Sequence, residues 1–509
     1  MSTTPTRTAA QLIPARCVRL AKITGAALVL AVLASGCAVA PKPFTPEERS
    51  TIAAGDRAKA QAEVPPLAGP LTLSQAIARA LKYNLDHRTR MMEEALAIGQ
   101  LDLSRYDMLP KLTAAAGYSW RDNERITRSQ DSVTGLPSLA NPYISSDRSH
   151  FTQDLGLTWN ILDFGVSYQN SKQNADRVLV ASERRRKAMH LLMQDVRTAY
   201  WRAASAQQLD ASLRETIRIA DTALNDSRRI EAEKLRDPLE ALRYQRSLLE
   251  NLRVLESVQL ELGAARTELA ALINVPLNTS FQLAEPQADD LTPKPFGMPV
   301  EQMEEIAIAN NADLKEQFYS ARIAVVETRK SILKLLPGLS LNYGYRHDDD
   351  SYLINNDWQE AGAQIGLNLF SLLSAPSMLR FSEANRLLAE QRRMATQMAV
   401  LAQVHLSLQQ FQSAQTLFRR ADSIWKVDRR IDEHSANREA AEVKGQLDRV
   451  SNNTAAIVSL LRRYQALNQV YAARSKMQAT LGVEPQIGSL QDISLEDLVR
   501  AVETADQQG

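Results

Sequence analysis

Residue types that usually carry chemistry are few in this chain and form no reactive arrangement. Its 509 residues include two cysteines, Cys17 and Cys37, so the chain beyond them has no thiol for a disulfide or a metal site. The six histidines are scattered, with no two at the spacing of a pair of metal ligands. No phosphate-binding loop, dinucleotide fingerprint or nucleophile elbow occurs. We therefore expect neither an enzyme nor a resident metal or cofactor.

Cys37 is the one residue whose surroundings indicate a reaction. A basic start is followed by the apolar run 26–34 and then by small residues, which is typical of a secretory signal that is removed. The last four residues, Ala34-Ser35-Gly36-Cys37, resemble a bacterial lipobox, in which the cysteine is acylated; that motif more often has leucine at the place of Ala34. We expect a lipoprotein signal peptide over 1–36 and a lipid on Cys37. The alternative is an ordinary signal peptide with an incidental cysteine.

The segment after Cys37 indicates a destination. Ala38 rather than aspartate follows the cysteine, which in lipoproteins of this type implies passage to the outer membrane. The prolines between 38 and 70 favour an extended tether over 37–70. Beyond it, no stretch approaches the roughly 18 to 20 apolar residues of a transmembrane helix. The 60 basic and 59 acidic residues balance, which argues against a nucleic-acid binder.

The rest of the chain is predicted to be two copies of one unit. Asn84 falls on Asn311 at the same offset at which Pro110 falls on Pro337, and after a change of offset Asn160 falls on Asn368. This is a long duplication rather than a short solenoid repeat. The expected boundaries are a first repeat at 71–276, a linker at 277–300, a second repeat at 301–484 and a C-terminal tail at 485–509.

Four short stretches alternate strictly between apolar and polar residues: 112–120, 154–161, 339–346 and 361–369. Alternation over about ten residues, with aromatics near the ends, is the pattern of a transmembrane β-strand. A half-buried strand of a soluble sheet shows the same alternation. Four such stretches, in β-hairpins at about 111–162 and 338–370 with polar loops, favour a barrel.

Long helices are expected after each hairpin. No glycine or proline occurs from 166 to 237, and no proline from 377 to 484. Apolar residues there step by three and four, which is the seam of a coiled coil. The prediction is one long helical hairpin at about 166–274 and another at about 377–482.

Together these elements imply an assembly. In lipid every backbone polar group must be paired, so open sheet edges cannot persist. Four strands cannot close a barrel, for which about eight is the practical minimum. Several copies must therefore share one barrel. The expected fold class is an α+β membrane protein, a pore extended by a helical tube.

Several stretches are similar to the TolC-like outer-membrane efflux proteins: the run 71–84, Leu109-Pro110, the run 159–165, Leu336-Pro337 and Thr480-Leu481-Gly482. The resemblance extends over about 70–485. It implies a trimer with a twelve-stranded outer-membrane β-barrel above a twelve-helix periplasmic tunnel. It also implies that the tunnel end closes like an iris and docks a periplasmic adaptor protein, which connects it to an inner-membrane pump.

The repeat locates that tunnel end at two helix breaks, near 234–238 and 442–446. By the resemblance, the candidates for adaptor docking are Lys234, Leu235, Arg236, Val443 and Lys444. The family often has serine where this chain has Arg236. Family members also carry acidic residues that narrow the aperture, and Asp448 is the nearest match. For each of these residues the alternative is a solvated helix turn.

The functional hypothesis is a lipid-anchored exit duct in the outer membrane. It would pass substrates from a periplasm-spanning pump to the outside, in proton-driven efflux of small molecules or drugs. The alternative is the outer-membrane component of a type I or ABC-driven secretion system. A periplasmic adaptor would have one helical hairpin between β-rich halves, and a purely structural coiled coil would leave the β-hairpins unexplained.

Overall fold

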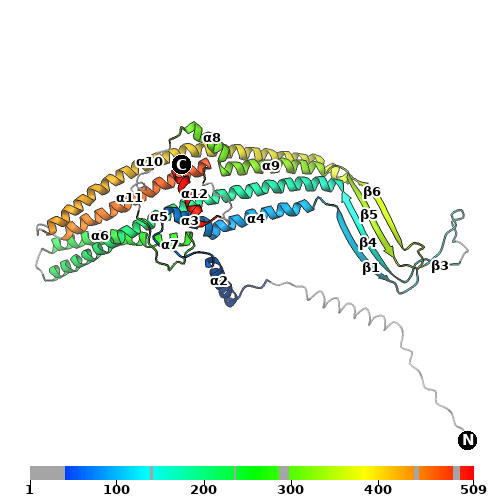
Figure 1. The fold of residues 1–509 in the computed structure, drawn as a ribbon, viewed down its shortest axis with the longest axis horizontal. Helices are drawn as coiled ribbons and strands as arrows, with labels where there is room; N and C mark the ends of the chain where they lie inside the picture. The colour runs from blue at the N-terminus through cyan, green and yellow to red at the C-terminus, as the bar shows by residue number, and fades with distance from the viewer. Residues whose placement is uncertain are drawn as a thin grey trace, which may run out of the picture. The chain divides into compact units, whose positions relative to one another are not determined.

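The computed structural model describes six stretches of the chain, residues 41–137, 141–233, 237–285, 297–440, 446–484 and 493–508. The chain divides into two compact units, Met1–Glu63 and Val64–Gly509. The second unit contains a β-sheet and long helices, which Figure 1 labels. Among the described residues, no helix combines the length and the apolar character needed to cross a bilayer.

The first unit contains helix α2 (Pro46–Gln61), where an extended tether was expected. The local sequence explains the difference. Thr45 Oγ1 accepts from the Glu48 backbone N–H at 3.2 Å, and the Glu48 carboxylate accepts from the Thr45 N–H at 2.8 Å. This capping box, with Pro46 in the first helical turn, starts a helix in a segment whose proline content alone favours extension.

The sheet of the second unit has four antiparallel strands in the order β1-β4-β5-β6. They are β1 (Lys111–Trp120), β4 (Ser149–Asn160), β5 (Gly338–Asp348) and β6 (Asp357–Gly366). A two-stranded ribbon, β2 (Ile126–Thr127) and β3 (Tyr143–Ile144), lies in the connection between β1 and β4. All four alternating stretches are therefore strands. The fourth lies earlier than predicted, because Asn368 already caps the next helix by accepting from the Phe370 N–H at 3.1 Å.

Two helices of 72 residues each follow the sheet, α5 (Ile161–Ala232) and α10 (Leu369–Ala440). At 1.5 Å per residue each is about 108 Å long. Both begin several residues before the predicted starts. Asn160 caps α5 directly at the end of β4, accepting from the N–H groups of Leu162 and Asp163 at 3.0 and 3.1 Å. In α10 the helix runs through Pro376, which was expected to precede it; the missing N–H removes one backbone bond near the helix start, and the later turns continue.

Each long helix returns after a break. The chain leaves α5 at Ala232 and resumes in α6 (Pro238–Gly263) and α7 (Ala265–Leu272). It leaves α10 at Ala440 and resumes in α11 (Gln446–Leu481). Pro238 begins α6 under the cap of Asp237, whose carboxylate accepts from the Leu239 N–H at 3.2 Å.

Shorter helices precede each hairpin. The first half has α3 (Leu73–Tyr83) and α4 (Leu85–Tyr106), and the second has α8 (Val300–Asn310) and α9 (Ala312–Leu333). The pairs match in length, with 11 residues in α3 and α8 and 22 in α4 and α9. Helix α4 packs on α5, α5 on α9, and α9 on α10. The helix order α4-α5-α9-α10 thus continues the strand order β1-β4-β5-β6 (Figure 1).

The main hydrophobic core lies around α3, the middle of α5, α7 and α11. Two segments that were expected to be a linker and a tail contribute to it. Leu283 forms a parallel bridge with Leu71, and both side chains are buried. Helix α12 (Leu495–Gln508) packs on α3 and buries Leu498 and Val502 completely.

Candidate functional site

The register of the sheet places most of the apolar residues of the four strands on one face. Leu112 pairs with Leu157, Leu157 with Tyr343, and Tyr343 with Ala361. Successive side chains alternate between faces, so the other apolar positions of each strand share this side. The face is open: Leu112 is 67% exposed and Ile365 is 75% exposed. We call it the apolar face.

The opposite face, the polar face, carries the glycines and most of the charges of the strands; the pair of His347 with Asp357 lies at the loop end of the apolar face. One row across it reads Ala115, Asp154, Arg346 and Trp358, and the next reads Thr113, Gly156, Gly344 and Glu360. Arg346 Nε lies 3.5 Å from Asp154 Oδ1, and Arg346 Nη1 lies 3.2 Å from Glu360 Oε2. One guanidinium therefore links three strands.

Aromatic side chains mark both ends of the apolar face. Tyr118 and Trp120 end β1 on the loop side and are 70% and 65% exposed. On the helix side Trp159 contacts Phe164 edge to face, with ring centroids 5.9 Å apart. Bands of aromatics above and below an apolar surface are typical of strands that meet both interfaces of a bilayer.

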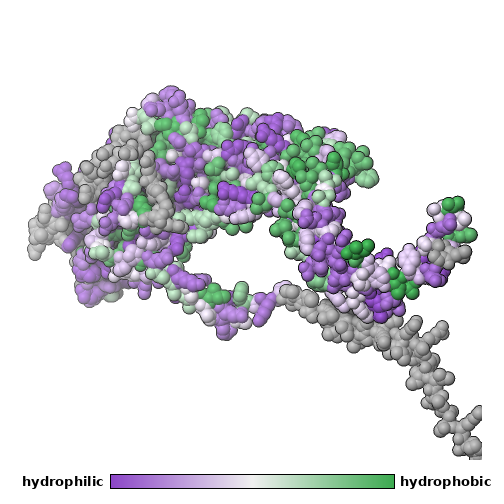
Figure 2. All heavy atoms as spheres, turned by 45° about the vertical axis from the view of Figure 1, so that its right-hand side comes forward, coloured by the Kyte–Doolittle hydropathy of each residue, from purple (hydrophilic) through white to green (hydrophobic). Residues whose placement is uncertain are grey.

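Both margins of this layer lack a neighbour within the described chain. Strands β1 and β6, ten residues each, are the sheet edges. The helices on the same margins expose large apolar side chains, with Leu96 of α4 at 75% and Phe370 and Leu373 of α10 at 81% and 77%. Figure 2 shows hydrophobic side chains gathered where the helices meet the sheet.

Between the two halves, by contrast, the contact of α5 with α9 is made by paired polar side chains of the same chain. Arg322 pairs with the buried Asp176, and Gln173 donates to Glu327 at 2.8 Å. Farther along, Lys187 pairs with Asp313 at 2.8 Å. These bonds join the first half of the unit to the second.

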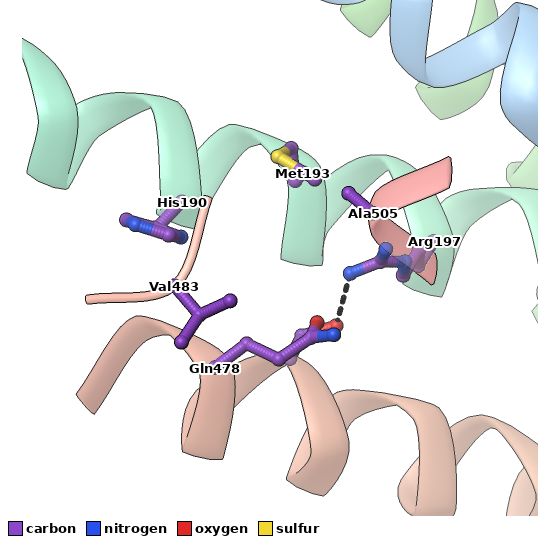
Figure 3. Close-up of a pocket in the computed structure, with 7 residues that line it drawn as sticks. His190, Met193, Arg197, Gln478, Val483 and Ala505 are labelled. Atoms are coloured by element: carbon purple, nitrogen blue, oxygen red, sulfur yellow. Dashed lines mark hydrogen bonds between the residues drawn. The ribbon is translucent and has the colours of Figure 1, made fainter. Parts of the chain in front are cut away.

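A small cavity lies where α5, α11 and α12 meet (Figure 3). Its volume is about 10 Å³, roughly what one water molecule needs. It is lined by His190, Met193, Arg197, Ser475, Gln478, Val483 and Ala505. Arg197 donates to Ser475 Oγ at 2.6 Å across it. Burial, and then the charges of Arg186 and Arg197, lower the pKa of His190 to about 4, so this imidazole is neutral at pH 7. The cavity serves packing, and the described residues include no cluster of three or more potential metal ligands.

The structure does not describe the side chains of the site residues that were predicted from the sequence. Cys37, Lys234, Leu235, Arg236, Val443 and Lys444 lie outside the described residues. The backbone of Asp448 belongs to the first turn of α11, but its side chain is also outside them. They remain predictions.

Sequence reasoning did not single out the group formed by Asp154, Arg346 and Glu360. Its members were visible as polar positions of alternating strands. What was missing was the pairing of β4 with β5, since these strands belong to different halves of the chain. An Arg and an Asp at polar positions of two alternating strands were the available signal.

Residues 76–275 match the family model described as outer membrane efflux protein. The fold is similar to that of the CmeC outer membrane channel of Campylobacter jejuni, with a TM-score of 0.64 and 13% identity over 85% of this chain and 89% of that one. It is also similar to the outer membrane protein VceC of Vibrio cholerae (TM-score 0.59, 15% identity, 81% and 96% covered). A third match is the MtrE outer membrane channel of Neisseria gonorrhoeae (TM-score 0.58, 16% identity, 81% and 88% covered). No curated protein sequence matches the chain.

Proposed function

We propose, from the match of residues 76–275 to the outer membrane efflux protein family and from the shared fold, that the chain works at the outer membrane as the trimeric exit channel of a tripartite pump for small molecules. The observation that carries this proposal is the two-faced sheet. Its apolar face suits lipid, its polar face suits a water-filled interior, and its helices continue the same layer in the same order.

The number of copies follows from strand count and direction. Adjacent strands are antiparallel, so the two edges β1 and β6 run in opposite directions. The β6 edge of one copy can therefore pair with the β1 edge of the next in the same antiparallel pattern. Two copies would give eight strands, whose interior is just wide enough to be filled by side chains. Three copies give twelve strands and an open channel, and the exposed apolar margins of α4 and α10 meet in the same step.

The trimer is testable directly. In mild detergent the purified protein should have the mass of three chains, and in planar bilayers it should conduct. Cysteines placed at Thr113 of β1 and Gln364 of β6 should crosslink between copies. The background should be low, because the described residues include no native thiol. A conducting monomer would contradict the proposal, because its sheet edges would have to persist in lipid.

The lipid anchor on Cys37 is part of the proposal and rests on the lipobox. Acyl chains would hold the N-terminus at the membrane that the barrel already spans. The variant Cys37→Ser should therefore lose acylation and keep the trimer. Mass spectrometry of the mature N-terminus decides the point: an unmodified first residue other than Cys37 would remove the anchor from the model.

The partners are proposed at the opposite end, at the breaks between α5 and α6 and between α10 and α11. There Lys234, Leu235 and Arg236, with Val443 and Lys444, would meet the helical hairpin of a periplasmic adaptor, and Asp448 would narrow the aperture. A cysteine at position 236 should crosslink to the cognate adaptor in cell envelopes. If a cysteine in the β1–β4 loop crosslinks to it instead, the orientation is reversed.

A further inference from the structure

We propose that Asp154, Arg346, Glu360 and Trp358 form a belt on the polar face that selects organic cations over anions. This proposal rests on the proposed function, since a belt exists only if the sheet closes around a channel. Its position is in the β-barrel wall, far from the tips at which the adaptor would dock.

The belt is built by the register of three strands. Arg346 of β5 stands between Asp154 of β4 and Glu360 of β6, at 3.5 and 3.2 Å from their carboxylates. All three side chains are about half exposed, at 51%, 49% and 49%. Exposed pairs of this kind contribute little to stability. They keep about half of their surface available to a passing solute.

The charges of the belt do not cancel. Two carboxylates against one guanidinium leave one negative charge per copy, and three in a closed trimer. Two further ionisable groups lie close to the loop end of the polar face, Asp348 and His150, which contact each other at 2.7 Å. Asp348 adds to the negative side. In a channel with low-dielectric walls, rings of carboxylates favour cations and hold back anions.

The lysine on this face, Lys111, is too far away to compensate, and His150 at the loop end is already paired with Asp348. Lys111 is the first residue of β1, four positions from Ala115, which stands in the row of Arg346. Four residues of a strand span about 13 Å. The Debye length at physiological salt is about 8 Å, so its charge is largely screened at the belt.

Glycines leave the belt standing clear of its surroundings. Gly156 and Gly344 face each other in the row next to Arg346, on the helix side. In the following row Gly362 lies under Asn342, where an added Cβ would come within 2.8 Å of the amide oxygen. In the row next to Arg346, the two positions between Thr113 and Glu360 therefore carry no side chain that could cover the guanidinium.

Trp358 defines the class of solute. It stands beside Arg346 in the same row, and it is 36% exposed. An indole face next to carboxylates fits an organic ammonium group, which the ring attracts through its quadrupole and the carboxylates through their charge. An inorganic cation would use only the carboxylates, and an anion would be repelled.

The charge of the belt is tested by reversal potentials of the purified channel in a KCl gradient. Glu360→Gln should lower the ratio of cation to anion permeability by about two- to threefold, and Arg346→Gln should raise it by a similar factor. Arg346→Lys keeps the charge and should stay near the wild type. Glu124→Gln removes a carboxylate from an ion pair with Arg148 in the β1–β4 loop, and it should change little.

If Glu360→Gln lowers the permeability ratio and Arg346→Gln raises it, a general loss of structure cannot be the cause, because it would not act in opposite directions. Equal ratios in the wild type and in both charge variants, at normal conductance, would overturn the belt. Absence of conductance from the wild type would overturn the proposed function instead. Raising the salt concentration should shrink all the differences, because the charges are then screened.

The aromatic part is tested by channel block with tetrabutylammonium. Trp358→Leu should weaken block about five- to tenfold, the loss expected for a partly solvated cation–π contact of about 1 to 1.4 kcal/mol. Trp159→Leu is the matched control, because Trp159 belongs to the apolar face. Equal block in both variants would remove Trp358 from the site while leaving the charge argument to the reversal potentials.

Discussion

Two regions of this chain treat similar apolar side chains in opposite ways. Around α3, α5 and α7, Ile77 and Leu269 are 0% exposed and Trp201 is 2% exposed. In the sheet and the start of α10, Leu112, Ile365 and Phe370 are 67%, 75% and 81% exposed. A buried side chain of this size contributes about 1.5–3 kcal/mol. The first region obtains that stabilisation from its own chain, whereas the second can obtain it only from lipid or from further copies.

The largest effect should come from the self-sufficient region. Trp201 stacks on Tyr471 with ring centroids 5.4 Å apart. Trp201→Ala should lower the free energy of unfolding by about 3–5 kcal/mol, because the surrounding side chains cannot fully fill the space that the indole leaves. Trp120→Ala in the sheet should cost under about 1 kcal/mol, since Trp120 is 65% exposed. Denaturant unfolding in detergent, followed by circular dichroism, measures both. Similar losses for the two tryptophans would erase the distinction between the regions.

The next effect separates the two faces of the sheet. Leu155→Arg places a charge on the apolar face in the middle of β4, and it should destabilise the membrane-inserted protein by about 2–4 kcal/mol. Thr158→Arg, on the polar face of the same strand, should be tolerated. The measurement is the fraction of folded trimer in outer membranes. If Thr158→Arg proves the more damaging change, the faces have been assigned the wrong way round.

The stability of the buried region should depend on pH through His190. The pKa of His190 is lowered to about 4 by burial and by the charges of Arg186 and Arg197. Glu484 lies 3.9 Å away, but Arg186 holds its carboxylate at 2.8 Å and offsets its charge. The stability from neutral His190 is therefore present above pH 6.5 and is lost as the pH falls toward 4, because only the unfolded chain binds the proton.

Between pH 6.5 and 5 this loss should reach about 1.6 kcal/mol. Unfolding curves at several pH values measure it. His190→Gln removes the titrating group and should flatten this part of the profile, whatever its effect at neutral pH. An unchanged slope in that variant would assign the pH dependence to another group.

The smallest effect concerns the points at which strands become helices. Asn160 accepts from two backbone N–H groups, and Asn368 is bonded to one at the equivalent place. Asn160→Ala should cost about 1 kcal/mol and Asn368→Ala somewhat less. Thermal midpoints would show the difference, and Asn160→Asp, which can cap equally well, should restore most of the loss. No difference between Asn160→Ala and Asn160→Asp would mean that capping contributes nothing there.

How much of this was predictable depends on the range of each interaction. Alternation is local, so the four strands could be predicted, and the long helices follow from the absence of helix breakers. Helix α2 was missed because its capping box at Thr45 and Glu48 competes with the prolines. The start of α10 was missed because Pro376 is tolerated near a helix start. The burial of Leu498 and Val502 was missed because it depends on α3, more than 400 residues earlier.

In the candidate site too, features set by local sequence were predictable and features set by distant pairing were not. The apolar face could be anticipated strand by strand, since alternation places each side chain. The contacts of Arg346 with Asp154 and Glu360 required the pairing of β4 with β5, which no local pattern specifies. The predicted tip residues and Cys37 rest on family resemblance and on the lipobox, and they stay predictions.

That same pairing sets an order of events during folding. Hairpins β1–β4 and β5–β6 close within single loops, but the seam between β4 and β5 joins residues 180 positions apart, as in the contact of Asn160 with Ser340. Such a seam must wait until the intervening helices have been made, and distant pairings of this kind form slowly. Until then β4 is an unpaired edge at risk of aggregation. Pulse-labelled hydrogen exchange should therefore find the hairpin bonds protected first and the central seam last.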